Sequence, residues 1–172
     1  MAVVIPALRP GPPLVELVRS LARAPIERIV VVDDGSGADY QEWFAECEGF
    51  PRAEVLRHAV NLGKGAALKT GINHVLCACP EVGGVVTADA DGQHHPEDVL
   101  RVAHRLAEQP DRMVLGSREF GPETPWRSRL GNAVTRNLVR LLIGHALSDT
   151  QTGLRGIPRA LLPHLLAIPS SG

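Results

Sequence analysis

Short apolar blocks alternate along the chain with longer stretches in which apolar residues recur at helical spacing. The apolar blocks have the length of β-strands, and they cover residues 2–5, 29–32, 55–56, 85–87 and 113–115. The stretches between them are typical of amphipathic helices that place one face against a core. This alternation of strand and helix predicts an α/β fold built on a parallel sheet.

Three of the intervening stretches carry a distinct apolar stripe. Their apolar positions are Leu14, Leu17, Val18 and Leu21; then Leu68, Ile72, Val75, Leu76 and Cys79; then Val99, Val102, Ala103 and Leu106. Pro96 stands where the first turn of the third helix accepts a proline. A less regular helix is expected over residues 130–143, after a loop rich in Gly and Pro at residues 121–125.

Polar and glycine-rich sequences follow the first four predicted strands. They are Pro6 after the first strand, then residues 33–36, 61–65 and 89–94 after the next three. In parallel α/β sheets, ligands bind beyond the carboxyl ends of the strands. The four turns are therefore predicted to converge on one binding site.

Asp89 and Asp91 directly follow the fourth apolar block. In an extended segment, residues two apart project to the same side, so both carboxylates are able to meet at one hard cation such as Mg²⁺ or Mn²⁺. Gly92 permits a tight turn, and Gln93 offers a further oxygen ligand. The alternative is that these aspartates are solvated turn residues, which is the usual role of an isolated Asp-x-Asp sequence.

Two further groups of residues leave alternatives open. Asp33 and Asp34 either stabilise a turn that has Gly35 in a left-handed conformation, or accept hydrogen bonds from a base N–H or a ribose hydroxyl. Lys64 lies between two glycines at the start of a helix, which suits either phosphate binding or simple solvation. The spacing of a P-loop is absent.

Six segments in order along the chain resemble glycosyltransferase family 2, and within it the sugar transferases that act on polyprenyl phosphates, typified by dolichyl-phosphate mannose synthase. The matching segments are Val3-Val4-Ile5-Pro6-Ala7, Val31-Val32-Asp33-Asp34-Gly35-Ser36, Asn61-Leu62-Gly63-Lys64-Gly65, Asp89-Ala90-Asp91-Gly92-Gln93-His94, Gly116-Ser117-Arg118 and Asp149-Thr150-Gln151-Thr152-Gly153-Leu154-Arg155. The last segment, with Gln93-His94, favours the polyprenyl-phosphate group. One difference is that Leu8-Arg9-Pro10-Gly11 stands where members of the family often have Asn-Glu.

The resemblance implies a GT-A fold with a Rossmann-like, mostly parallel central sheet flanked by helices, and an inverting transfer. It implies that the nucleotide sugar contacts Pro6, Ala7, Asp33, Asp34, Lys64, Asp89, Ala90, Asp91 and Gln93. The metal ligands would be Asp89, Asp91 and Gln93, and the ion would be Mg²⁺ or Mn²⁺. Arg118 would face the phosphates, helped by Arg127 or Arg129.

The expected reaction transfers a hexose or N-acetylhexosamine from a GDP- or UDP-linked donor to a polyprenyl phosphate. Such an acceptor is already anionic, so it needs cations that hold it in line and no general base. Asp91 and Arg118 are then the main candidates for catalysis. Asp149 would act as a base if the acceptor were a hydroxyl, and it is otherwise a helix or turn cap. A soluble family 2 transferase and a donor-binding module without turnover remain alternatives.

Length and charge add limits to this picture. The 172 residues carry a net charge of −1, which gives no electrostatic footprint for nucleic acid. We expect one catalytic domain, with a donor-binding half over residues 1–95 and an acceptor-side half over residues 96–172. The family usually continues beyond such an end, so a C-terminal truncation is expected.

The location of the protein is predicted from what the sequence lacks. Cys47, Cys77 and Cys79 show no zinc-binding pattern and are expected to be reduced thiols. No run approaches the ~20 apolar residues of a membrane span, and no signal segment is recognised. We therefore expect a cytoplasmic protein at the inner face of the cell membrane. Residues 138–143 are either core or a lipid-facing patch for peripheral membrane contact.

Overall fold

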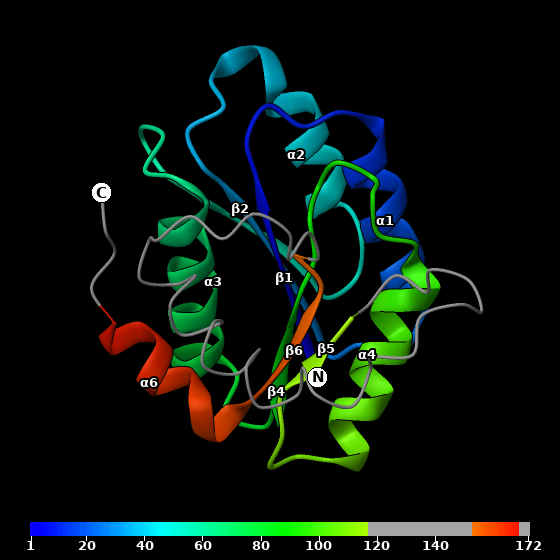
Figure 1. The fold of residues 1–172 in the computed structure, drawn as a ribbon. Helices are drawn as coiled ribbons and strands as arrows, with labels where there is room; N and C mark the ends of the chain where they lie inside the picture. Colours follow the sequence, from blue (N-terminus) through cyan, green and yellow to red (C-terminus); the bar gives the residue numbers. More distant parts are fainter. Residues whose placement is uncertain (117–152, 169–172) are drawn as a thin grey trace, which may run out of the picture.

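The fold is a six-stranded, mostly parallel sheet covered by helices on both faces (Figure 1). The computed structural model describes residues 1–116 and 153–168. The strands are β1 (Ala2–Ala7), β2 (Arg28–Asp33), β3 (Ala53–Arg57), β4 (Gly84–Thr87), β5 (Val114–Leu115) and β6 (Arg155–Pro158). They lie in the order β3-β2-β1-β4-β6-β5. The strands β1 to β4 are parallel, whereas β6 runs antiparallel to both of its neighbours.

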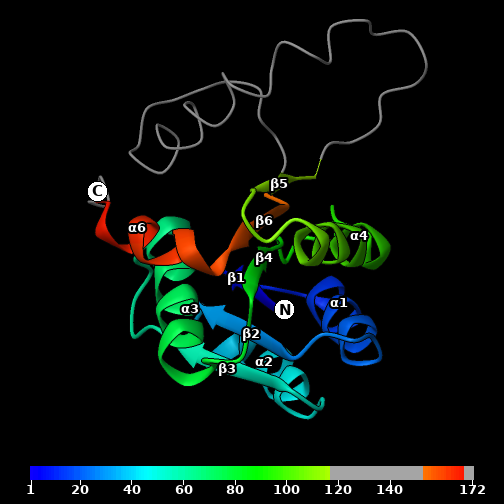
Figure 2. The same ribbon diagram turned by 90° about the horizontal axis from the view of Figure 1, so that it is seen from below.

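The helices divide between the two faces of the sheet. They are α1 (Pro12–Ala22), α2 (Gln41–Glu48), α3 (Lys64–Ala78), α4 (Pro96–Glu108) and α6 (Leu162–Ala167), with short 3₁₀ helices at Ala38–Tyr40 and Arg159–Leu161. Figure 2 shows α3 and α6 on one side of the sheet and α1, α2 and α4 on the other. The protein is therefore a three-layer α/β domain.

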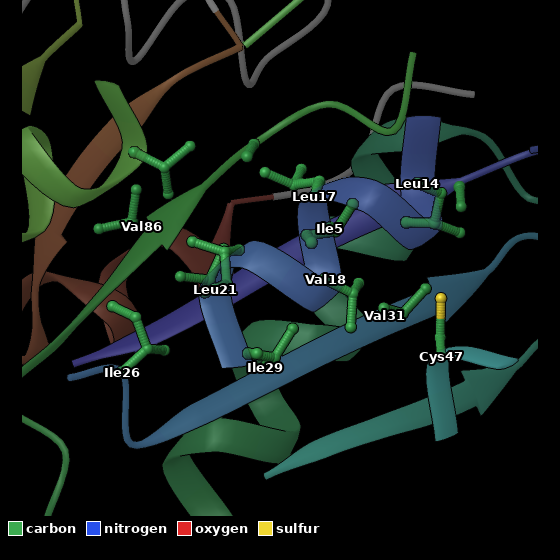
Figure 3. Close-up of a cluster of buried hydrophobic side chains, with 14 of the residues drawn as sticks. Ile5, Leu14, Leu17, Val18, Leu21, Ile26, Ile29, Val31, Cys47 and Val86 are labelled. Carbon is green, nitrogen blue, oxygen red and sulfur yellow. The ribbon is translucent and has the colours of Figure 1, made fainter. Parts of the chain in front are cut away.

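The central strands are buried on both faces, which explains their continuous apolar sequences. Val3 and Ile5 of β1 belong to the core beneath α1, α2 and α4. Figure 3 shows Ile5 beside the apolar side chains of α1. Ala2 and Val4, which alternate with them along β1, belong to the core beneath α3 and α6. Because successive side chains of a strand point to opposite faces, one strand supplies both cores.

The predicted elements are largely confirmed. All five predicted strands are present, although the third is longer than predicted and the fifth is shorter. The three striped stretches form α1, α3 and α4, and Pro96 is the first residue of α4. The helix predicted at residues 130–143 and the loop at 121–125 lie outside the described residues.

The strand β6 and two short helices, α2 and α6, are not among the elements that the sequence predicts. The strand β6 enters the sheet between β4 and β5, so the edge of the sheet is antiparallel where a purely parallel arrangement is the simplest expectation. This strand carries the end of the last motif, with Arg155 as its first residue. It therefore brings the C-terminal part of the chain beside the residues that follow β4.

Candidate functional site

A pocket of about 420 Å³ lies at the carboxyl ends of the parallel strands. Its lining combines residues from the turns after β1, β2, β3 and β4. These residues are Pro6, Ala7, Leu8, Arg9, Pro10, Gly11, Pro13, Asp34, Asn61, Gly63, Lys64, Asp89, Ala90 and Asp91. The predicted convergence of four turns on one site is therefore confirmed. Seven of the nine predicted nucleotide-sugar residues line the pocket, whereas Asp33 and Gln93 do not.

Asp34 is 3% exposed, and its carboxylate is fully engaged by groups from the turn after β3. Oδ1 accepts a hydrogen bond from the Leu62 backbone N–H at 2.9 Å and lies 2.8 Å from His58 Nδ1. Oδ2 accepts one from the Gly63 N–H at 2.9 Å. The other ring nitrogen of His58 lies 2.9 Å from the Thr70 hydroxyl on α3. Asp34 therefore fastens the turn after β3, and the start of α3, to the end of β2.

Asp33 is also buried, and its carboxylate connects the turn after β2 with the start of α2. Its carboxylate accepts from the Ser36 backbone N–H at 2.8 Å and from Gln41 Nε2 at 3.0 Å. Gly35 has a φ of +73°, and a Cβ atom there would lie 2.3 Å from the Val60 carbonyl carbon. The turn therefore requires a glycine both for its left-handed backbone and for the close approach of the next loop. A role of Asp33 in binding the nucleotide stays a prediction.

Asp89 has cationic and polar neighbours from three different parts of the chain. Lys64 Nζ lies 2.5 Å from its Oδ1, and His94 Nε2 lies 3.6 Å from its Oδ2. Gly153 packs against the same carboxylate so closely that a Cβ atom there would lie 2.3 Å from Oδ2 and 2.5 Å from Oδ1. The Gly153 carbonyl is held in turn by the Thr87 hydroxyl at 2.7 Å.

These neighbours keep Asp89 ionised. His94, and then Lys64, lower the pKa of Asp89 to about 2, and they outweigh the burial that would raise it. The distance of 3.6 Å between His94 Nε2 and Asp89 Oδ2 is just beyond that of a hydrogen bond. The buried Nε2 atom has no hydrogen-bond partner among the described residues. His94 is therefore a polar neighbour of Asp89 without a hydrogen bond to it. Burial lowers the pKa of Arg155, which Asp89 partly offsets. The carboxylate is thus available as an anionic ligand.

Asp91 is exposed and lies in a turn after β4. The sequence places Asp89 and Asp91 in an extended segment, and this expectation is wrong because β4 ends at Thr87 and a turn begins at Ala90. Both nevertheless line the same pocket. The Gln93 backbone N–H and Nε2 donate to Asp91 at 3.0 and 2.8 Å. Gln93 therefore presents its amide nitrogen to Asp91, and its predicted role as a metal ligand stays a prediction.

Asp89 and Asp91, which line the pocket after β4, fit a hard divalent cation whose other ligands come from a bound molecule. Asp89 and Asp91 supply carboxylate oxygens, which Mg²⁺ and Mn²⁺ prefer. Within residues 1–116 and 153–168, no cluster of three or more His, Cys, Asp and Glu side chains is placed to hold a metal. A Mg²⁺ ion in proteins is commonly held by one or two carboxylates together with substrate phosphates. The pocket therefore suits a metal that is bound jointly with an anionic ligand.

Four predicted site residues, namely Arg118, Arg127, Arg129 and Asp149, lie outside the described residues. The pocket lining adds Leu8, Arg9, Pro10, Gly11 and Pro13, which the sequence does not assign to the site. Around the carboxylates of Asp34 and Asp89, the structure adds four further residues: His58, Thr70, Gly153 and Arg155. The last two belong to the sixth family motif, whose glycine could have signalled a close backbone approach. No signal in the sequence points to His58 or Thr70.

The cysteines and the described helices bear on the remaining predictions. Cys47 and Cys79 are buried and Cys77 is exposed, and all three are free thiols. Burial raises the pKa of the Cys47 thiol to about 12, which keeps it protonated and unreactive. None of the helices in the part of the chain that the structure describes is long and apolar enough to cross a membrane.

Comparisons with known sequences agree with these motifs. The model of the family described as glycosyl transferase family 2 matches residues 2–166. An uncharacterised protein of Methanocaldococcus jannaschii is 37% identical, over 89% of this chain and 62% of its own length. The UDP-N-acetylglucosamine–dolichyl-phosphate N-acetylglucosaminyltransferase of Methanococcus voltae is 28% identical, over 92% of this chain and 69% of its own length.

Another relative is the undecaprenyl-phosphate 4-deoxy-4-formamido-L-arabinose transferase of Pseudomonas aeruginosa, which is 33% identical over 97% of this chain and 49% of its own length. Among solved structures, glucosyl-3-phosphoglycerate synthase of Mycobacterium tuberculosis with bound UDP aligns with a TM-score of 0.60 and 23% identity, over 93% of this chain and 57% of that one. This chain thus spans about half to two thirds of the length of these proteins. The structural likeness confirms the expected GT-A fold.

Proposed function

Because the chain belongs to glycosyl transferase family 2, we propose that it forms the donor-binding part of a metal-dependent, inverting glycosyltransferase. The donor is a nucleotide diphosphate sugar, and the sugar is a hexose or an N-acetylhexosamine. The observation that carries the proposal is the meeting of Asp89, Asp91 and Lys64 in one pocket at the ends of the parallel strands. Two carboxylates and one ammonium group match a metal-bound diphosphate in charge and in ligand type.

The donor is proposed to lie along the pocket from the turn after β1 to the turn after β4. Pro6 and Ala7 line its wall near Asp34, so this end suits the nucleoside. The carboxylate of Asp34 already has three partners, so we propose that it shapes the nucleoside end of the pocket more than it contacts the base. At the other end, Lys64 and the first turn of α3 suit the diphosphate, because the free N–H groups of a helix start favour anions.

A divalent cation, when bound, would neutralise the charge that develops on the leaving nucleotide diphosphate. Asp89 and Asp91 are the residues that would hold it, and the low pKa of Asp89 keeps that carboxylate ionised at neutral pH. The solved structures of the Mycobacterium tuberculosis synthase include complexes with Mn²⁺, UDP and UDP-glucose. These complexes support the proposal of a metal-bound donor for this chain.

The proposed acceptor is a polyprenyl phosphate, which puts the reaction at a membrane surface. This part of the proposal is supported by the activities for which the relatives from Methanococcus voltae and Pseudomonas aeruginosa are named. A phosphate acceptor already carries the negative charge needed for attack, so cations that hold it in line replace a general base. Arg118, Arg127 and Arg129 are the proposed cations.

A second candidate is an acceptor that is not a lipid. It is favoured by the structural likeness to glucosyl-3-phosphoglycerate synthase, whose solved complexes include phosphoglyceric acid. A hydroxyl acceptor requires removal of a proton, and Asp149 is the proposed base for that case. A module that binds the donor without turnover is a third candidate. Release of nucleotide diphosphate with a polyprenyl phosphate, with phosphoglyceric acid or with neither would separate the three.

Calorimetry tests the donor site directly. UDP and GDP are titrated into the protein with and without Mn²⁺, and the titrations are repeated with Asp91→Ala and with Asp39→Ala, which removes an exposed carboxylate that does not line the pocket. We expect metal-dependent binding of one nucleotide, weakened at least about tenfold in Asp91→Ala and unchanged in Asp39→Ala. Absence of binding of either nucleotide at millimolar concentration with Mn²⁺ would contradict the proposal.

A further inference from the structure

We propose that Lys64 occupies the cation position beside Asp89 until the metal-bound donor arrives, and then transfers to the diphosphate of the donor. This exchange would couple metal binding to donor binding. The inference rests on the proposed function, because it takes a divalent cation and a nucleotide diphosphate as the ligands of this pocket.

The first step is the competition for one oxygen atom. Lys64 Nζ lies 2.5 Å from Asp89 Oδ1, within the pocket that both residues line. A Mg²⁺ ion on the same oxygen would lie at about 2.1 Å from it. An ammonium group and a divalent cation that share one carboxylate oxygen would lie close enough to repel each other strongly. Binding of the metal at Asp89 Oδ1 therefore requires that Lys64 leaves.

The second step identifies the partner that moves. The Asp89 side chain is 20% exposed, and Gly153 lies directly behind its carboxylate, which leaves no space for withdrawal. The Lys64 side chain is 56% exposed and belongs to the first residue of α3. Its two neighbours in sequence are glycines, and an added Cβ atom at either would have no atom of the described residues within 4 Å. A lysine side chain is long and flexible, so Lys64 is the group that moves.

The third step concerns what Lys64 gains on leaving. Without a donor, Asp89 is the only carboxylate with which Lys64 forms an ion pair in the part of the chain that the structure describes. A diphosphate bound at the start of α3 would give the ammonium group a new anionic partner within reach of its flexible stem. A bare cation offers Lys64 no such anionic partner.

The consequence is a defined coupling between two ligands. Lys64 weakens the binding of the free metal because it competes for Asp89, and it strengthens the binding of the metal with nucleotide because it then holds the diphosphate. Thermodynamic linkage requires that the nucleotide and the metal enhance each other by the same factor. Removal of Lys64 is therefore expected to affect the two measurements in opposite directions.

The experiment measures Mn²⁺ binding by electron paramagnetic resonance, first with Mn²⁺ alone and then with saturating UDP or GDP. The variants are K64M, which removes the charge and keeps most of the length, and K64R, which keeps the charge. R101M is the matched control, because Arg101 pairs with Asp98 on α4 and does not line the pocket. Circular dichroism verifies that each variant is folded.

We expect K64M to bind Mn²⁺ alone about fivefold more tightly than the unchanged protein, as suits loss of a partly exposed competing ion pair. We expect the enhancement of Mn²⁺ binding by the nucleotide to fall at least about tenfold in K64M. K64R and R101M should resemble the unchanged protein in the binding of Mn²⁺ alone.

Two other outcomes have separate meanings. If K64M binds Mn²⁺ alone no more tightly than the unchanged protein does, while Asp91→Ala abolishes Mn²⁺ binding, the exchange is wrong and the proposed donor site stands. If no variant binds Mn²⁺ with or without either nucleotide, both the exchange and the proposed function are overturned.

Discussion

The pocket has two acidic turns, one after β2 and one after β4, and they use the same side chain in different ways. Asp34 accepts hydrogen bonds from two backbone N–H groups and lies beside His58, so its partners are fixed by the fold. Asp89 forms an ion pair with Lys64 and lies near His94, and its charge acts on Arg155. Backbone donors keep a carboxylate in place permanently, whereas a lysine on a flexible stem is replaceable by another cation.

This difference assigns separate tasks to residues that look alike in the sequence. The carboxylate of Asp34 is engaged in holding the turn after β3, which includes Gly63 and ends at Lys64. The carboxylate of Asp89 is held ionised and packs closely against Gly153. The first turn therefore builds the pocket, and the second is suited to binding within it. Substitutions in either turn test this division of tasks.

The largest expected effect on stability is at Asp34. Asp34→Asn replaces one oxygen with an NH₂ group, which faces a backbone N–H or His58 where an acceptor is needed. Loss of charge-assisted hydrogen bonds and a buried donor without a partner are expected to reduce the free energy of unfolding by about 3 kcal/mol.

Urea denaturation measures this change. Asp39→Asn is the matched control, because Asp39 is exposed and belongs to a short 3₁₀ helix that follows the same turn. Equal midpoints for the two variants would mean that the hydrogen bonds of Asp34 do not hold the turn after β3, and the contrast with Asp89 would then fail.

A second effect is expected at Gly153. An alanine there would put its methyl carbon 2.3 to 2.5 Å from the two carboxylate oxygens of Asp89, so the carboxylate or the backbone must shift. We expect Gly153→Ala to reduce the free energy of unfolding by about 2 kcal/mol, as overpacking typically does. We also expect metal-dependent nucleotide binding to weaken by at least about tenfold, because a shift of this size displaces a metal ligand.

Gly83→Ala is the control for this substitution. Within residues 1–116 and 153–168, a Cβ atom at Gly83 would meet only the Met1 side chain, at the ordinary contact distance of 3.7 Å. Gly83 lies before β4 and does not line the pocket. Urea denaturation and nucleotide calorimetry are measured on both variants. If Gly153→Ala binds the metal-bound nucleotide as tightly as Gly83→Ala does, then the contact with Gly153 does not set the position of Asp89.

The sequence predicted the frame of the site better than its internal contacts. Strands β1 to β4 were predictable because each is an apolar block, and the turns after them were predictable because Asp, Gly and Pro interrupt the pattern. The strand β6 was not predictable, because its sequence, Arg155-Gly156-Ile157-Pro158, shows neither alternating polar and apolar residues nor an apolar run. Its place in the sheet depends on pairing with β4, which is remote in sequence.

The partners of the two carboxylates were unpredictable for the same reason. His58 and Thr70 meet Asp34 only because β3 and α3 pack beside β2, and Gly153 meets Asp89 only because β6 pairs with β4. A sequence pattern places a residue at the end of a strand, but it does not give the neighbour that folding brings to it. The two acidic turns could therefore be predicted as a site, and their different tasks could not.

The smallest expected effect tests the charge on Asp89. The pKa of Asp89 is about 2 in the folded protein and 3.8 at its ordinary value. A folded-state pKa that is lowered stabilises the protein above the ordinary pKa, and that stability is lost as the pH falls through the folded value. Between pH 5 and pH 2 the protein is therefore expected to lose about 1–2 kcal/mol through this group. Asp89→Asn should lack this part of the loss.

The measurement is urea denaturation of both proteins at about pH 5 and about pH 2.5, because the remaining carboxylates are common to both and cancel in the difference. High salt should reduce the difference, since part of the effect comes from the Lys64 ion pair, which is accessible to solvent. Identical losses in the two proteins would show that the surroundings of Asp89 do not favour its charged form. Asp89 would then be no better suited than Asp34 to binding a cation, and the proposed difference between the two acidic turns would be wrong.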